Sequence, residues 1–240
     1  MNSSYQICAS CICDTSIEGI KFDLNGECSF CKLHHALEKE CPIDGKKLPR
    51  IIEEIKRTTH KKYDCIVGVS GGRDSIYSLY LIRRVFGLNP LAVHFNDGFG
   101  NPVAGKNIKN ACEALEVELR TITSDWRESK DLKIAFLRAS TPDLEEGTDL
   151  GIATALYGVA CSEGVKYVFF GQSFRTEGIS PLTWNYLDGR YLRDVHGKYG
   201  TFPLRNWEPT DPGFNLGIKE LIYYVCLLYT SPSPRDQRGS

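Results

Sequence analysis

Short apolar runs alternate with amphipathic stretches along most of this chain. Four runs rich in β-branched and aromatic residues predict buried strands at 64–69, 90–95, 117–122 and 166–170. Apolar residues at helical spacing predict helices at 48–57, 75–86, 104–115, 126–138 and 149–161. This alternation predicts an α/β fold, with a parallel sheet that carries helices on both faces.

The pattern divides the chain into parts. Residues 1–45 have few apolar positions and hold six of the ten cysteines, so they predict a small separate module. Residues 46–62 predict a helix and a basic linker, and residues 63–225 predict the sheet domain. Residues 226–240 have no periodic pattern and resemble a translated sequencing-adapter read. We interpret them as a non-native tail on a C-terminally truncated domain, the alternative being a natural disordered tail.

Composition narrows the class of protein. The 240 residues are 42% hydrophobic and 25% charged, which is typical of a globular chain. The balance of 29 Lys and Arg against 30 Asp and Glu argues against a general binder of polyanions. No apolar run approaches the roughly 18 residues of a membrane span, and the N-terminus does not resemble a signal peptide. We therefore expect a cytoplasmic protein, in which paired cysteines more often bind metal than form disulfides.

Four cysteines have the spacing of a zinc ribbon. Cys8 and Cys11 form one C-x-x-C pair, Cys28 and Cys31 form a second, and 16 residues separate the pairs. Two such turns can close a tetrahedral thiolate site, and a structural zinc stabilises a module too small to have a core of its own. Free thiols or a redox pair are the alternatives. Cys13, Cys41, His34 and His35 are possible substitute ligands.

A glycine-rich turn follows the first predicted strand. Ser70-Gly71-Gly72-Arg73-Asp74-Ser75 opens the next predicted helix, and consecutive N–H groups in such a turn can bind an anion. The string is neither a Walker A loop nor the dinucleotide signature of Rossmann folds. Asp74 repels phosphate, so we expect it to cap the helix or to help hold Mg²⁺. The alternative is an ordinary strand-to-helix turn.

The string resembles the PP-loop of the ATP pyrophosphatase superfamily. The resemblance implies an adenine nucleotide alpha-hydrolase-like (HUP) sheet, with ATP bound across the carboxyl ends of the first two strands. It implies ATP contacts for all six residues from Ser70 to Ser75. It also implies adenosine contacts for His94, Asn96 and Asp97, which end the second strand. A packed core histidine is the equal alternative for His94.

Further stretches resemble the N-acetyl sugar amidotransferases of lipopolysaccharide and surface-glycan synthesis. They are the two cysteine pairs with Gly19–Asp23, Tyr63–Ser75, Asp125–Phe136, Gly171–Glu177 and Asp194–Pro203. The similarity covers nearly all of residues 5–225. Cys13 stands where these enzymes have Met or a similar residue.

This resemblance implies an ATP-dependent enzyme that forms an acetamidino sugar. The acetamido oxygen of a nucleotide-linked sugar attacks the α-phosphate of ATP, and ammonia then displaces AMP. The implied catalytic residues are Ser70, Gly71, Gly72, Asp74, Ser75, Arg175 and Glu177, and the implied nucleotide contacts extend to Gly171, Gln172 and Thr176. Asp125 and Asp149 precede predicted helices and are expected to be N-caps. Separate glutaminase and cyclase subunits are the implied source of ammonia, because no glutaminase motif is visible in the chain.

Two other functions fit parts of the sequence. PP-loop enzymes that thiolate tRNA can also carry zinc modules, but nucleic acid is an unlikely partner because the only basic stretch is 56–62. Cys65, Cys112 and Cys161 are isolated and are expected to be core thiols. A non-enzymatic zinc-ribbon adaptor that senses a nucleotide is the second alternative.

Overall fold

The computed structural model describes residues 5–42, 47–59, 61–177, 179 and 188–207. The contacts between residues divide the chain into two compact units. The first unit contains the described residues up to Arg50 together with those from Gln172 to Ile179. The second contains Ile51–Gly171 and the described residues 188–207. The expected tail at 226–240 and the expected domain end at 225 lie outside the described residues.

The second unit is built on a four-stranded parallel sheet. Its strands are β1 (Cys65–Gly68), β2 (Pro90–Asn96), β3 (Glu118–Thr123) and β4 (Val168–Phe169), arranged in the order β3-β2-β1-β4. Cys65 pairs with Pro90 between β1 and β2, and Leu91 pairs with Glu118 between β2 and β3. The chain therefore builds the sheet to one side of β1 and then returns to its other side. That reversal makes the carboxyl ends of β1 and β4 a topological switch point, where ligands bind in folds of this class.

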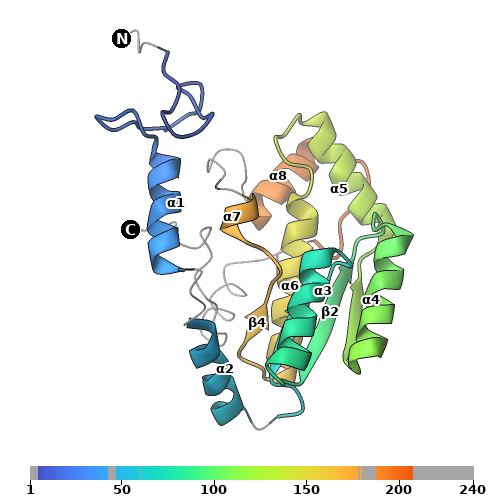
Figure 1. The fold of residues 1–240 in the computed structure, drawn as a ribbon. Coiled ribbons are helices and arrows are strands. Elements are labelled where there is room, and N and C mark those ends of the chain that lie inside the picture. Colours follow the sequence, from blue (N-terminus) through green and yellow to red (C-terminus); the bar gives the residue numbers. More distant parts are fainter. Residues whose placement is uncertain (1–4, 43–46, 60, 178, 180–187, 208–240) are drawn as a thin grey trace. The chain divides into compact units, whose positions relative to one another are not determined.

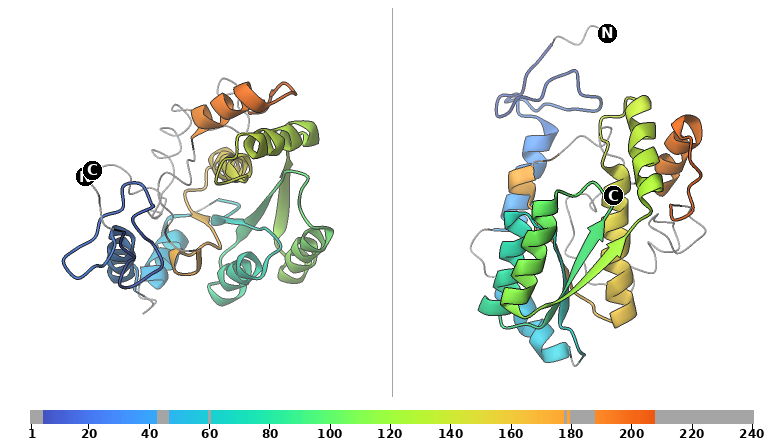
Figure 2. Two further views of the ribbon diagram at one scale, coloured as in Figure 1. Left: turned by 90° about the horizontal axis from the view of Figure 1, so that it is seen from above. Right: turned by 90° about the vertical axis from the view of Figure 1, so that its right-hand side faces the viewer.

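Helices cover both faces of this sheet (Figures 1 and 2). One face carries α3 (Arg73–Tyr80), its π-helical continuation η1 (Leu81–Val85) and α4 (Pro102–Leu115). The other face carries α5 (Trp126–Arg138) and α6 (Glu146–Glu163), and α8 (Gly189–Tyr199) packs against α5 and α6. The expected parallel sheet with helices on both faces is confirmed.

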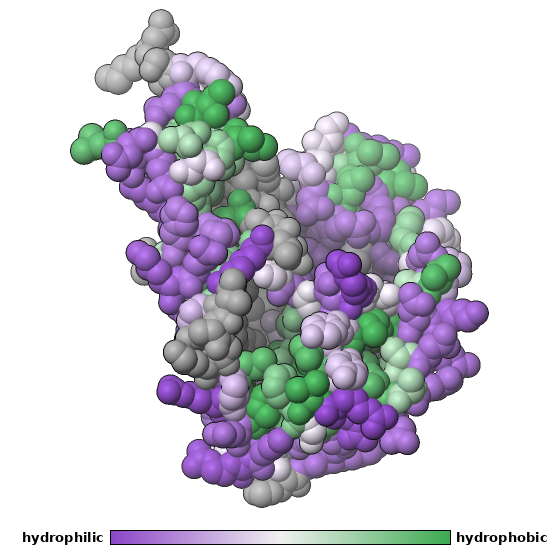
Figure 3. All heavy atoms as spheres, in the orientation of Figure 1, coloured by the Kyte–Doolittle hydropathy of each residue, from purple (hydrophilic) through white to green (hydrophobic). Residues whose placement is uncertain are grey.

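Two clusters of buried side chains hold the second unit together. Ile66, Leu91 and Val93 of the central strands pack against Leu156 and Val159 of α6. The second cluster joins α5, α6 and α8 around Phe95, Phe136 and the fully buried Trp207. The exposed face over α3 and α4 carries hydrophobic side chains in small groups among hydrophilic ones (Figure 3). No described helix is long and apolar enough to cross a membrane.

The first unit contains the cysteine-rich segment and short helices. Its elements are α1 (Ser29–Glu40), the first residues of α2 (Lys47–Thr58) and α7 (Phe174–Glu177). Short antiparallel bridges between Ile7 and Asp14 and between Phe22 and Cys28 fold the segment before α1 into two tight turns. Gly26 has a positive φ angle in the second turn, and Gly19 has one in the segment between the two turns. The boundary between the units falls inside α2, between Arg50 and Ile51.

Candidate functional site

The glycine loop, residues 70–75, joins the carboxyl end of β1 to the first turn of α3. Gly71 has a φ of 81°, in the left-handed region that favours glycine. A Cβ added at Gly71 would also lie 2.3 Å from the carbonyl oxygen of Ala104 in α4. Both the backbone angle and the contact with α4 therefore require glycine at this position.

Two hydroxyl groups fix the shape of the glycine loop from inside. The Oγ atoms of Ser70 and Ser75 lie 3.1 Å apart, and the Ser70 N–H donates to Ser75 Oγ at 3.1 Å. The Ser75 hydroxyl also donates to the Gly72 carbonyl at 3.1 Å, and Ser75 is buried. In the described structure these hydroxyls have partners within the loop. The serines therefore stabilise the main-chain conformation of the loop, to which an anion would bind.

The first turn of α3 adds the positive end of a helix to the loop. Gly72 is its N-cap residue, and no side chain caps the helix there. The expectation that Asp74 caps the helix is wrong, because Asp74 lies in the first turn and its side chain is 74% exposed. Its Oδ1 is 3.5 Å from Nε of Arg73, which is even more exposed. The first N–H groups of a helix have no intrahelical partner, so this turn offers donors to a bound anion.

Three residues from other elements border the loop. The amide of Asn107 in α4 donates to the Gly71 carbonyl at 3.3 Å. Gly171, just after β4, lies so close that an added Cβ would be 3.0 Å from the backbone nitrogen of Ser75. The ring of His94 in β2 bonds through Nδ1 to the Val69 carbonyl at 2.9 Å. Because a carbonyl only accepts, this bond places a proton on Nδ1 and leaves Nε2 as the second polar atom of the ring.

Asn107 was missed by the sequence analysis. Its signal is weak, since it is a polar residue one turn into an amphipathic helix with no motif around it. Only the packing of α4 against the loop shows that this amide reaches the Gly71 carbonyl. By contrast, Gly171 was expected at a nucleotide site, and it lies against the glycine loop.

Asn96 and Asp97 hold the turn that follows β2. Asn96 Oδ1 accepts from the Gly98 N–H at 3.0 Å, and Asp97 Oδ1 accepts from the Phe99 N–H at 3.0 Å. Asp97 is buried, and its Oδ2 accepts from the Thr148 hydroxyl at 2.8 Å. Nζ of Lys133 lies 3.5 Å from the same oxygen. The structure thus gives both side chains a part in shaping the loop between β2 and α4.

The residues expected just past β4 belong to the first unit. Arg175 donates to the Cys41 carbonyl, pairs with Glu38 at 3.6 Å and lies over the Phe174 ring at 4.5 Å. Gln172 is exposed. Thr176 and Glu177 are in α7, but their side chains lie outside the described part of the chain.

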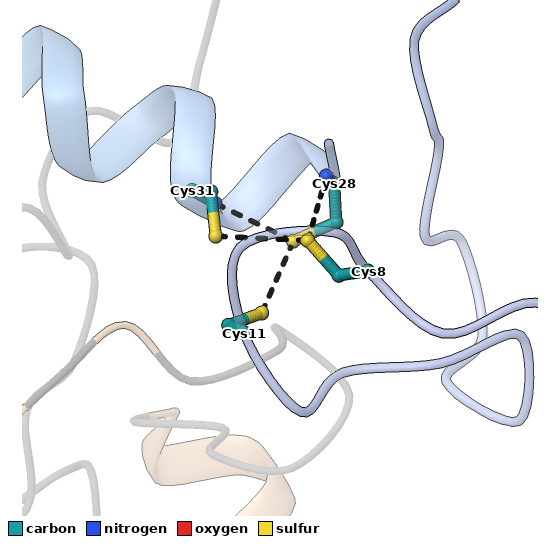
Figure 4. Close-up of side chains that lie close together, drawn as sticks. All are labelled: Cys8, Cys11, Cys28 and Cys31. Carbon is teal, nitrogen blue, oxygen red and sulfur yellow. Dashed lines mark hydrogen bonds between the residues drawn. The ribbon is translucent and has the colours of Figure 1, made fainter. Parts of the chain in front are cut away.

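The four expected metal ligands come together at the start of α1 (Figure 4). Their sulfur atoms all lie within 4.8 Å of one another, with Cys8 and Cys31 3.9 Å apart and Cys11 and Cys28 3.6 Å apart. These distances are far longer than a disulfide bond. They match the roughly 3.8 Å between sulfurs around a tetrahedral zinc with Zn–S distances near 2.3 Å.

Backbone N–H groups surround these sulfurs as they would surround thiolates. Cys8 Sγ accepts from the N–H groups of Ser10 at 3.3 Å and Cys28 at 3.2 Å, and Cys11 Sγ accepts from Cys13 at 3.4 Å. Burial opposes ionisation of Cys8, but these backbone donors outweigh it and lower the pKa of this thiol to about 6. Burial raises the pKa of Cys28 and of Cys31. The donor set fits zinc, which would be held by all four cysteines with no open position.

The substitute ligands do not join this quartet in the described residues. Cys13 contributes only its N–H, while His35 faces Glu27 at 3.5 Å and His34 faces Glu38 at 3.9 Å. The carbonyl of Cys41 is bound to Arg175.

Comparison with known proteins adds limited information. No family model matches the chain. An uncharacterized protein of Methanocaldococcus jannaschii is 33% identical over 88 residues, which are 35% of this chain and 32% of that protein. The chain thus spans about a third of the length of the curated relative that it matches.

Solved structures similar to this chain include three of different function. An NH3-dependent NAD synthetase from Campylobacter jejuni is 16% identical at a TM-score of 0.43, over 64% of this chain and 70% of that one. A predicted tRNA methyltransferase subunit from M. jannaschii is 20% identical at 0.34, over 68% and 73%. A U34-tRNA thiolase from Methanococcus maripaludis, solved with its [4Fe-4S] cluster, is 15% identical at 0.37, over 80% and 68%. At these TM-scores the similarities say nothing about function.

Proposed function

We propose that this protein is an AMP-forming amidotransferase of the PP-loop ATP pyrophosphatase superfamily, acting on the N-acetyl group of a sugar. The observation that carries the proposal is the glycine loop at the carboxyl end of β1, bordered by Gly171 at the switch point of the sheet. A turn of glycine amides at a helix N-terminus suits a phosphate chain, and this position in a parallel sheet suits a nucleotide.

The proposed reaction activates an amide with ATP. The acetamido oxygen attacks the α-phosphorus and pyrophosphate leaves; ammonia then adds to the activated carbon, and AMP leaves with the former acetamido oxygen. The protein's task is to position the reactants and to stabilise developing negative charge. We assign the phosphates to the amides of Gly71, Gly72 and the first turn of α3. Asp74, whose carboxylate is exposed, would hold Mg²⁺, which neutralises phosphate charge when bound.

The remaining proposed roles follow the resemblance of the sequence. His94, Asn96 and Asp97 would border the adenosine. The resemblance gives Arg175 the neutralisation of a phosphate or sugar-nucleotide charge, and it gives Glu177 the orientation of ammonia or of the amide. The four-cysteine site would hold a structural zinc, and separate glutaminase and cyclase subunits would supply ammonia. The product would serve lipopolysaccharide or surface-glycan synthesis.

The rival reaction, tRNA thiolation, needs a reactive sulfur carrier or an iron–sulfur cluster near the nucleotide. Cys65 and Cys112 are buried, and burial raises the pKa of both thiols and of Cys161. Such thiols are poor nucleophiles. The three cysteines described in the second unit therefore favour a reaction without a protein sulfur carrier.

An exchange assay tests the proposed function. We expect the full-length protein to exchange labelled pyrophosphate into ATP only when an acetamido sugar nucleotide is present, with ammonium salts completing turnover. Gly71→Ala should lower the exchange rate by about 10²-fold or more, because the Cβ displaces α4 and misplaces the loop donors. Exchange stimulated by tRNA instead would favour thiolation, and none with any acceptor would favour a non-enzymatic adaptor.

The matched control for this assay is Gly105→Ala. Gly105 lies in the first turns of α4 next to Ala104, and a Cβ added there meets no atom within 4 Å. It should leave exchange unchanged. An active Gly71→Ala protein would contradict the role of the loop, and circular dichroism of both variants separates loss of activity from loss of fold.

A further inference from the structure

Two exposed aromatic rings meet at the carboxyl edge of the sheet, and we call this pair the aromatic platform. Phe99 follows β2, and Trp126 is the first residue of α5, after β3. Their ring centroids are 4.6 Å apart with a tilt of 46° between the ring planes. Phe99 is 47% exposed and Trp126 is 46% exposed, so each ring presents a large apolar area to solvent.

The backbone around the platform brings the two rings together. Gly98 has a φ of 87°, and a Cβ added there would lie 2.5 Å from Cε3 of Trp126. On the other side, Asp125 caps α5 by accepting from the Arg127 N–H at 2.8 Å, as expected for this residue. Trp126 is thus held by a capped helix start and a glycine turn that leaves room for its ring.

A partly buried charged network supports Phe99. The Lys133 ammonium group lies 4.9 Å from the Phe99 ring centroid, and the Lys133 side chain is only 16% exposed. Its Nζ donates to Glu145 at 2.7 Å and to Thr148 at 2.9 Å. Asp97 binds the Phe99 N–H from the same network. The ring is therefore fixed in place before any ligand arrives, which reduces the entropy lost on binding.

The platform lies within reach of the glycine loop. Ala104, which contacts Gly71, is five residues beyond Phe99, and five residues span at most about 18 Å. Figure 1 shows the first turns of α3 and α4 at the same edge of the sheet. A molecule held on the platform could thus extend toward a nucleotide bound at the loop.

We infer that the aromatic platform binds the acceptor substrate by stacking against the C–H face of its N-acetyl sugar ring. The inference rests on the proposed function and names a subsite for that substrate. The face of an aromatic ring carries partial negative charge, which attracts the slightly positive C–H groups of a sugar ring. Two rings of this size offer room for one sugar ring, whose hydroxyl groups stay in water.

Calorimetric titration of the full-length protein tests this inference, with UDP-N-acetylglucosamine, UDP and ATP as separate probes. We expect Trp126→Ala and Phe99→Ala each to weaken UDP-N-acetylglucosamine binding by about three- to tenfold. Binding of UDP and of ATP should change less than about twofold. Trp126→Tyr should restore most of the affinity, because it returns an aromatic face.

Leu137→Ala is the matched control, since Leu137 is a 63% exposed apolar residue on the same helix. It should bind all three probes as the original protein does. Unchanged UDP-N-acetylglucosamine binding in Trp126→Ala would overturn the inference and leave the proposed function standing. An equal loss for UDP would overturn the sugar assignment in favour of a nucleobase. If the unsubstituted protein binds ATP but not UDP-N-acetylglucosamine, this result would overturn the inference and count against the proposed function as well.

Discussion

Two buried carboxylates of α5 organise the chain that follows α8. Asp131 accepts from the N–H groups of Thr201 and Phe202 at 2.9 Å and from His196 Nε2 at 2.8 Å. One turn earlier, Glu128 accepts from the N–H groups of Arg205 at 3.0 Å and Asn206 at 2.9 Å. Both carboxylates are buried, and they fasten the segment 201–206 to α5.

Asp131 should make the stability of the second unit depend on acid pH. Burial opposes its ionisation, but bonds from Phe202, Thr201 and His196 outweigh this and lower its pKa from 3.8 to about 2. The stabilisation is therefore fully present above about pH 4 and is lost as pH falls through about 2. We expect about 2 kcal/mol of the free energy of unfolding to disappear in this window. Urea unfolding at a series of pH values measures it.

Asp131→Asn should remove most of that pH dependence and lower stability at neutral pH. Asp194→Asn is the control, because Asp194 is an exposed carboxylate on α8. If the free energy of unfolding falls equally at acid pH in both variants, Asp131 does not cause the pH dependence.

The sequence contains a local signal for these buried carboxylates. Glu128 and Asp131 share a helix face with the buried Leu132, Ala135 and Phe136, at the i, i+3, i+4, i+7 and i+8 positions of an apolar stripe. Acidic residues at core positions predict buried partners. Which N–H groups they bind depends on contacts with residues about 70 positions away, which no local pattern contains.

At the scale of elements, apolar periodicity predicted the sheet unit well. The helix expected at 126–138 has those bounds, and the four expected strands occur within a few residues of their predicted limits. Asp149 is not an N-cap as expected, because α6 begins earlier, at Glu146. The expected helix at 75–86 is instead α3 followed by the π-helical η1, and the local pattern does not distinguish the two.

The helices α1, α7 and α8 were not predicted. In α1, only Leu37 is buried, and the N-cap is Cys28, whose sulfur accepts from the Cys31 N–H at 3.5 Å. In α8, Leu192 and Val195 are buried against elements distant in sequence. Neither helix has the apolar content that marks a helix by its sequence alone. The cysteine spacing nevertheless predicted the quartet at the start of α1.

Zinc removal should unwind α1. A helix of 12 residues is marginal on its own in water, and the N-cap of this one is Cys28, one of the four proposed zinc ligands. We expect a chelator, or Cys11→Ser, to release one zinc per chain and to lower helical ellipticity. A colorimetric zinc assay with circular dichroism measures both. Cys13→Ser should keep the metal and the helix, and loss of zinc in that variant would contradict the four-cysteine site.

At the scale of the whole molecule, the chain forms two units that each include distant stretches of sequence. The boundaries expected at 45 and 62 remain predictions from composition. The contacts between residues divide the chain inside α2, and they assign the described residues between 172 and 179 to the first unit. Composition describes only residues that are neighbours in the sequence, so it does not predict contacts between distant segments. The return of the chain after β4 depends on contacts such as Arg175 with Glu38, which are not local.

Two compact units predict two steps of unfolding. Only the first unit contains the four-cysteine site, so a chelator should shift one thermal transition and leave the other in place. Differential scanning calorimetry with and without chelator measures this, and added ATP should shift the second transition instead. A single transition that moves as a whole under both treatments would contradict independent units.

The close approach of Gly171 to Ser75 also determines when the glycine loop can be completed during synthesis and folding of the chain. The glycine loop leaves the ribosome nearly a hundred residues before Gly171, which closes one side of it. Until β4 pairs with β1, Gly171 is not next to the glycine loop, and the proposed binding site is incomplete. If ATP binds at the glycine loop as proposed, it would stabilise only chains in which β4 has joined the sheet, and it would shift the folding equilibrium toward them.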